Sequence, residues 1–160
     1  MPVIDLKNTT IKIQDGDSNE IEVRVGEGNI TWKETKNRQY ILDRGELDAV
    51  RDGDEAPVDL TLAFTWEWLR SNGAEAVTVE EALKKEGAAS AWETSGADAC
   101  EPYAVDIIVE NEGGCGAVLD ELITFSEFRY ESLDHDLKSG TVTVSGKCNE
   151  VAPTIIRTAL

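Results

Sequence analysis

Residues 57–71 read PVDLTLAFTWEWLRS, and this stretch decides the fold class. Apolar side chains occupy every second position from Val58 to Trp68, and mostly polar side chains occupy the positions between them. Such alternation is typical of a β-strand that buries one face and exposes the other to water. The run is about twice as long as an ordinary strand, which favours a barrel wall or a sheet shared between subunits.

The segment before this strand, residues 43–56, reads DRGELDAVRDGDEA and carries six carboxylates and two arginines. It has neither a helical nor a strand period, and it exceeds the roughly two to five residues of an ordinary hairpin connection. We therefore expect an extended surface loop, which is either solvated and mobile or a contact arm for another subunit. The expected contact residues are Asp43, Arg44, Glu46, Leu47, Asp48, Arg51, Asp52, Asp54 and Glu55.

The rest of the chain continues the β pattern in shorter runs. They cover residues 9–14, 20–25, 29–42, 103–112, 117–130 and 141–148, with turn-forming residues between them. The run at 117–130 changes phase, which predicts a bulge or bend near Thr124. The sequence thus predicts a mainly β fold, an antiparallel sandwich or half-open barrel. We expect a single domain over residues 1–160 with a C-terminal tail at 150–160.

One segment departs from the strand pattern. Residues 78–81, TVEE, form a capping-box sequence, and Val79, Ala82 and Leu83 follow on one helical stripe. Glu80 with Lys84 and Glu81 with Lys85 have the spacing of helical ion pairs. We expect one short amphipathic helix that ends before Gly87 and flanks a sheet.

Charge excludes one class of function. The chain has 160 residues and a formal net charge of −17, from 32 acidic and 15 basic residues, and residues 101–136 hold ten carboxylates with Arg129 as their single base. Such a surface repels phosphate backbones, so it does not support sequence-independent binding of nucleic acid. It fits either plain solubility, including in a salty habitat, or a surface that nucleic acid must pass without sticking. Because we find no membrane span and no secretory leader, we expect a soluble protein made in a cytoplasm.

Motifs for catalysis or metal binding are weak. His135 lies between two aspartates without a nucleophile motif, so we expect a loop-exposed histidine. Asp15, Asp17 and Asn19 resemble the start of a calcium loop, but Glu20 replaces the glycine that such a loop needs. We therefore predict no catalytic residue, no metal site and no cofactor, and we expect that the protein is not an enzyme.

The cysteines and the paired tryptophans leave alternatives open. Cys100, Cys115 and Cys148 contain no C-x-x-C pair, so they are interpreted as buried reduced thiols, with an inter-subunit disulfide as the alternative. Trp66 and Trp68 belong to the apolar side of the long strand, which favours core packing over stacking on a sugar or base.

Three blocks, taken in order, resemble the tail tube proteins of tailed bacteriophages. They are the acidic segment RGELDAVRDGDEAPV, the long strand DLTLAFTWEWL and the block FSEFRYESLDHDLKSGTVTVSGKCN near the C-terminus. The resemblance covers most of residues 1–150 and is strongest at 28–70 and 122–149. The resemblance rests on the order and the local amino-acid sequence of these blocks rather than on a catalytic signature.

The resemblance implies a β-sandwich flanked by a helix, and a hexameric ring whose inner sheets join into one barrel. Rings would stack into the hollow tail tube of a virion, and the loop at 43–56 would reach the neighbouring ring. Partners would be further copies of the chain and other tail proteins: the tape measure, terminator, baseplate and, in a contractile tail, a sheath. The tube would be assembled in the host cytoplasm, and DNA would pass through it without specific binding. Tube proteins of related bacterial injection machines share this fold, so that role also stays open.

In such a tube, the solvent-exposed face of the two long strands would line the bore. The residues expected to face the lumen are Thr31, Lys33, Thr35, Asn37, Asp59, Thr61, Thr65 and Glu67. An acidic lining would prevent many weak phosphate contacts from adding up and trapping the DNA. A hypothesis of another class is a monomeric carbohydrate- or ligand-binding β-sandwich that uses Trp66, Trp68 or the acidic loop.

Overall fold

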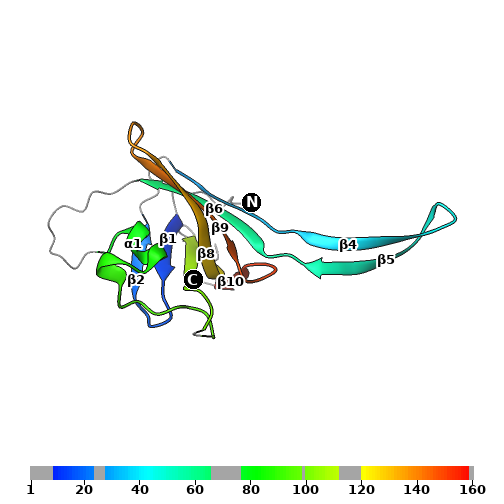
Figure 1. Cartoon of the computed structure of the whole chain (residues 1–160), viewed down its shortest axis with the longest axis horizontal. Helices are drawn as coiled ribbons and strands as arrows, with labels where there is room; N and C mark the ends of the chain where they lie inside the picture. Colours follow the sequence, from blue (N-terminus) through cyan, green and yellow to red (C-terminus); the bar gives the residue numbers. More distant parts are fainter. Residues whose placement is uncertain (1–8, 24–27, 66–76, 99, 112–119, 159–160) are drawn as a thin grey trace.

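The computed structural model describes residues 9–23, 28–65, 77–98, 100–111 and 120–158. Within these ranges the chain is mainly antiparallel β, with one short α-helix, α1 (Val79–Lys84), and a 3-10 helix, η2 (Gly87–Ala89). The predicted fold class is therefore confirmed. Figure 1 shows a compact body on one side and a long two-stranded arm that projects from it.

The body is built on one eight-stranded sheet. Seven strands follow the order β2-β1-β7-β8-β9-β6-β3, and the eighth, β10, pairs with β8 outside this order. Its strands are β1 (Thr9–Gln14), β2 (Glu20–Val23), β3 (Ile30–Lys33), β6 (Val58–Thr65), β7 (Val105–Asn111), β8 (Asp120–Asp136), β9 (Thr141–Cys148) and β10 (Thr154–Thr158). In the described part of the chain the path is open, because β2 and β3 each have a neighbour on one side only. The expected C-terminal tail is thus corrected in part, since Thr154–Thr158 is a paired strand.

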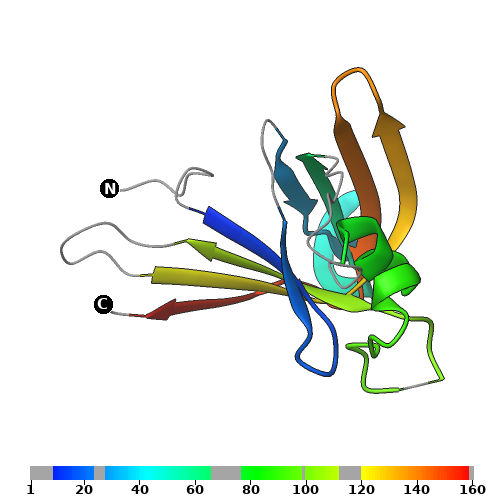
Figure 2. The same cartoon turned by 90° about the vertical axis from the view of Figure 1, so that its left-hand side faces the viewer.

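Strand β8 joins two halves of this sheet. Its first residues pair with β7 and β10, and the residues from Phe128 onward pair with β9. Between these two parts the register with β7 shifts, and Glu127 has a left-handed φ of 53°. The predicted bulge therefore exists, a few residues beyond Thr124. The two halves diverge from this bend in Figure 2.

The core lies between the two halves. Val58, Leu60, Leu62 and Phe64 of β6 are buried, as their alternation predicts, whereas Trp66 and Trp68 lie outside the described residues. Apolar side chains of β1, β7, β8 and β9 belong to the same cluster. The ring of Trp32 on β3 meets Phe125 on β8 edge-on, with centroids 5.0 Å apart, and so connects the halves.

Helix α1 covers part of this core through Ala82 and Leu83. Its capping box is confirmed: the Thr78 side chain accepts from the Glu81 amide, and the Glu81 carboxylate accepts from the Thr78 amide. The spacing of Glu80 predicted a pair with Lys84, but Glu80 Oε1 lies 2.6 Å from His135 Nε2 on β8. This contact joins the helix to the far end of the β8–β9 hairpin.

The arm corrects the loop prediction for residues 43–56. Strands β4 (Lys36–Asp43) and β5 (Glu46–Glu55) form a separate antiparallel sheet, joined by a two-residue turn at Arg44–Gly45 with φ of 54° and 82°. Strand β5 shows no alternation, because both of its faces are exposed and because a register shift opposite Ile41 and Leu42 breaks the two-residue period. Likewise, the run at 29–42 is two strands, β3 and β4, that belong to different sheets.

Candidate functional site

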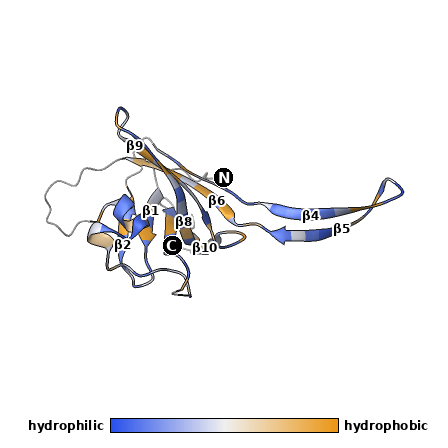
Figure 3. Ribbon diagram, in the orientation of Figure 1, coloured by the Kyte–Doolittle hydropathy of each residue, from blue (hydrophilic) through white to orange (hydrophobic). Residues whose placement is uncertain are grey.

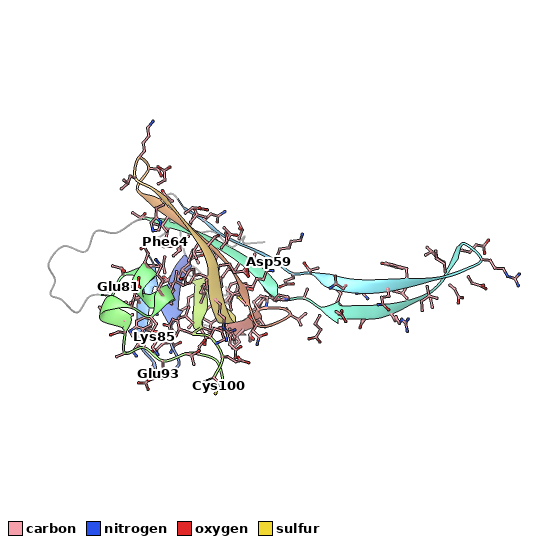
Figure 4. All side chains as sticks on the ribbon, in the orientation of Figure 1. Asp59, Phe64, Glu81, Lys85, Glu93 and Cys100 are labelled. Carbon is pink, nitrogen blue, oxygen red and sulfur yellow. The ribbon has the colours of Figure 1, made fainter. Side chains whose placement is uncertain are left out.

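The distal half of the arm carries an exposed apolar face. Tyr40 pairs with Val50 and Leu42 pairs with Leu47, so the four side chains share one side of the β4–β5 sheet. They are 61%, 55%, 59% and 76% exposed. Side chains project from both sides of the arm in Figure 4, and most of the arm is hydrophilic in Figure 3. We call these four residues the apolar arm face.

Polar contacts hold the two arm strands together nearer the body. Asp52 lies 3.6 Å from Lys36 Nζ and 3.5 Å from Arg38 Nη1, and Arg51 Nε donates to Gln39 Oε1 at 2.9 Å. Asn37 Nδ2 donates to the Asp54 carbonyl at 2.8 Å. Because these groups are exposed, each contact contributes little beyond the backbone pairing of the two strands.

The predicted contact residues on the arm therefore divide into two groups. Arg51 and Asp52 have side-chain partners within the arm, and Asp54 contributes its carbonyl. The other side chains, including that of Asp54, are exposed and make no hydrogen bond or ion pair to any described residue: Asp43, Arg44, Glu46, Leu47, Asp48, Asp54 and Glu55. The second group is the one available to a partner.

A second candidate surface is the solvent side of β6 and its neighbours. Asp59, Thr61, Ala63 and Thr65 alternate with the buried residues of β6. Register places Thr31 and Lys33 of β3 beside them on one flank, and Thr141, Thr143, Ser145 and Lys147 of β9 on the other. These ten residues form the polar sheet face.

The polar sheet face unites part of the predicted lumen set. Thr31, Lys33, Asp59, Thr61 and Thr65 all lie on it. Thr35 lies between β3 and β4, Asn37 belongs to the arm, and Glu67 is outside the described residues. The residues of β9 were missed although their Thr/Val alternation is visible, because a single sequence does not reveal that β9 pairs with β6.

The described part of this face is not acidic. Asp59 lies opposite Lys33 in the register, and Lys147 Nζ is 4.0 Å from Asp59 Oδ1 on its other side. The remaining positions carry hydroxyl groups or a methyl group. The two lysines outnumber the single carboxylate on the described part of this face, and whether it lines a bore stays a prediction.

The calcium-like turn at Asp15 is a structural clamp. Asp15 Oδ1 accepts from the Asp17 and Asn19 amides, and Oδ2 accepts from Asn19 Nδ2 and the Glu93 amide. Burial raises the pKa of this carboxyl, but these hydrogen bonds outweigh burial and hold the pKa below its ordinary value. Both oxygens are thus occupied by protein donors. Among the described residues, no cluster with metal-ligand geometry is present.

Three carboxylates crowd the bend in β8. Asp106 Oδ1 accepts from the Glu127 amide at 3.1 Å, and Glu150 Oε1 accepts from the Ser126 amide at 2.9 Å. Burial raises the pKa of Asp106, and the Glu127 carboxylate raises it further. Burial likewise raises the pKa of Glu150, and the carboxylates of Asp106 and Glu127 add to this shift. The acidic groups therefore hold the bulge in shape while repelling one another.

The thiols differ from each other. Cys148 is buried, as predicted, and burial followed by the nearby carboxylates of Glu150 and Asp106 raises its pKa to about 12. Cys100 is exposed, which corrects the expectation for that residue, and Cys115 lies outside the described residues. A thiol with so high a pKa is a poor nucleophile.

None of the described helices has the length and apolar character required to cross a membrane.

A comparison with known protein families and one with curated protein sequences each found no match. Among solved structures, a chain of the anti-feeding prophage (AFP) baseplate, six-fold symmetrised in cryo-EM, is 10% identical with a TM-score of 0.45; the alignment covers 98% of this chain and 96% of that one. A chain of the AFP tube-terminating cap is 14% identical with a TM-score of 0.49; the alignment covers 99% of this chain and 93% of that one. Both similarities are too weak to assign a function to this chain.

Proposed function

We propose that this chain is a structural, non-catalytic subunit that assembles with copies of itself into rings, and that the rings stack into a hollow tail-type tube. The sequence resemblance to phage tail tube proteins suggests hexameric rings, a place in the virion tail and DNA as the cargo. The polar sheet face would then line the bore. Other tail components would cap, measure and anchor the tube.

The arm is the observation that carries the proposal. An isolated two-stranded hairpin is only marginally stable in water, and the apolar arm face would be costly to keep exposed. The arm pairs with no other strand of the described chain. Both features fit a hairpin that is completed by contact with another subunit.

Open strand edges support ring formation. Strands β2, β3 and β10 each have one unpaired edge in the described chain, and such edges invite pairing with another chain. A head-to-tail contact between different surfaces closes into a ring when the rotation fits. Pairing within a closed ring would satisfy these edges without open-ended aggregation.

The polar sheet face fits a bore lining. The face carries hydroxyl groups and only one positive charge in excess, so it offers neither a continuous basic track nor aromatic platforms, which are the features that hold nucleic acid. A cargo would therefore pass this surface without strong attachment.

Removal of the arm tests the proposal. Replacing residues 38–52 with an Asn-Gly turn shortens the hairpin while keeping the Asn37–Asp54 contact near its base. We expect an unchanged melting temperature, because the arm lies outside the core, together with loss of tubes in negative-stain images. Tubes of normal length from this variant would overturn the role of the arm.

A further inference from the structure

A groove lies at the base of the arm. It has a volume of about 320 Å³ and is lined by Glu55, Ala56, Pro57, Asn149, Glu150 and Val151. These residues come from the end of β5, its link to β6, and the segment after β9. The Val58 amide donates to the Glu150 carbonyl at 3.1 Å, so the two walls are tied together. We call this the root groove.

The root groove is acidic on one side of Pro57 and borders cations on the other. Its described lining residues include two carboxylates and no cation, and the pKa of Glu150 is raised by burial and then by neighbouring carboxylates. Pro57 and Asn149 also line an adjoining groove of about 200 Å³, where the two cations Arg129 and Lys147 outnumber the single carboxylate, Glu131. A complementary partner would therefore present a cation beside an acidic group.

The arm tip has this arrangement. Arg44 is at the apex of the turn, and Asp43 and Glu46 form a cross-strand pair next to it. Like charges directly opposite each other destabilise a hairpin, so this pair favours a binding mode that brings a cation to it. Leu42 and Leu47, directly below, are exposed and match the apolar Pro57 and Val151 of the root groove.

We propose that the arm tip of one copy seats in the root groove of a second copy, with Arg44 between Glu55 and Glu150. Asp43 and Glu46 then face Lys147, while Leu42 and Leu47 cover Pro57 and Val151. This inference rests on the proposed function and identifies the surface that receives the arm. Because tip and root are different surfaces, the contact is heterologous, and where it joins one ring to the next it repeats along the tube axis.

Charge reversal tests the pairing of Arg44 with Glu55 in the full chain. Rings and tubes are scored separately by negative-stain microscopy and sedimentation velocity. We expect Arg44→Glu and Glu55→Lys each to reduce the tube fraction at least about tenfold while rings persist, as loss of a buried ion-pair partner does. The double variant should regain part of the tube fraction, because position 44 again meets an opposite charge at position 55, although Glu150 now opposes it. Lys138→Glu, at the exposed turn after β8, is the control with the same charge change as Arg44→Glu and should stack normally.

Each outcome is decisive. Normal tubes from both single variants would overturn the groove as the receiving surface while leaving the proposed function intact. Failure of the double variant to regain tubes would assign Arg44 another partner and would also overturn it. If the unaltered chain forms neither rings nor tubes, the proposed function itself fails.

Cross-linking gives an independent measurement. Arg44→Cys and Val151→Cys are combined in a chain that carries Cys100→Ser and Cys115→Ser. The two positions are at opposite ends of an arm about 30 Å long, far beyond the roughly 7 Å that a disulfide spans between Cα atoms, so any bond must join two copies. Oxidised tubes should give a ladder of covalent multimers, whereas the Lys138→Cys and Val151→Cys combination should not. Tubes without a ladder would overturn the proposed contact.

Discussion

Asp15 is the one charged side chain that the described core buries, at 4% exposure, and its four hydrogen-bond donors come from two separate segments. Asp15→Asn replaces one of the two acceptor oxygens with an NH₂ group, which is a donor and would face the N–H donors that now bind the carboxylate. We expect the free energy of unfolding to fall by about 1–3 kcal/mol, as for a buried group left without partners. Asp17→Asn, at an exposed position of the same turn, should change it little. Chemical denaturation of both variants gives the comparison.

Acid should weaken the same clamp. The folded-state pKa of Asp15 lies below its ordinary value, so its stabilisation is present above the ordinary carboxyl range and is lost as pH falls through the folded pKa. The stability difference between the unaltered chain and Asp15→Asn should therefore shrink in strong acid. A constant difference at all pH values would show that the charge of Asp15 is not involved.

Asp106 should behave in the opposite way. Its folded-state pKa is raised, chiefly by burial, so the ionised group opposes folding, and stability falls as pH rises from the ordinary carboxyl range through the folded pKa. Asp106→Asn keeps an oxygen that can accept from the Glu127 amide. We expect a higher melting temperature at neutral pH and little change in acid, measured by scanning calorimetry. A lower melting temperature at both pH values would mean that the carboxylate stabilises the bend.

At the scale of elements, the bend of β8 needs a close approach to β9. A Cβ atom on Gly146 would lie 2.2 Å from the Arg129 carbonyl oxygen and 2.9 Å from the Phe128 ring. Gly146→Ala should therefore cost about 3 kcal/mol of stability, because backbone atoms must move. Gly140→Ala, in the β8–β9 turn, meets nothing within 4 Å and carries only the strain of its φ of +67°. Equal urea midpoints for the two variants would contradict this packing.

The elements also show what a single sequence can predict. Strand β9 has the predicted bounds, Thr141–Cys148, and the buried side of β6 follows its alternation, because in both strands one face meets the core. Strand β5 was missed because hydrogen bonding to β4 holds it without burying either face. The polar sheet face was only half predicted, since the pairing of Asp59 with Lys147 joins strands that are far apart in the sequence.

For the whole molecule, net charge should oppose assembly. Copies that each carry a formal charge of −17 repel one another, and the proposed tip contact adds only a few favourable charge pairs. The Debye length falls from about 30 Å at 0.01 M salt to about 8 Å at 0.15 M, so added salt removes most of this repulsion. We expect sedimentation velocity to show more assembly as sodium chloride rises over this range. Less assembly with added salt would mean that specific ion pairs dominate over net repulsion.

Electron microscopy of the purified full chain tests the central claim most directly. The chain is concentrated toward the millimolar range in moderate salt, with sonicated fragments of any assembled material added as seeds, and is imaged in negative stain. The account predicts end-on views of closed rings with a central channel and side views of stacked tubes. A chain that shows no rings and sediments as a monomer at that concentration would contradict it.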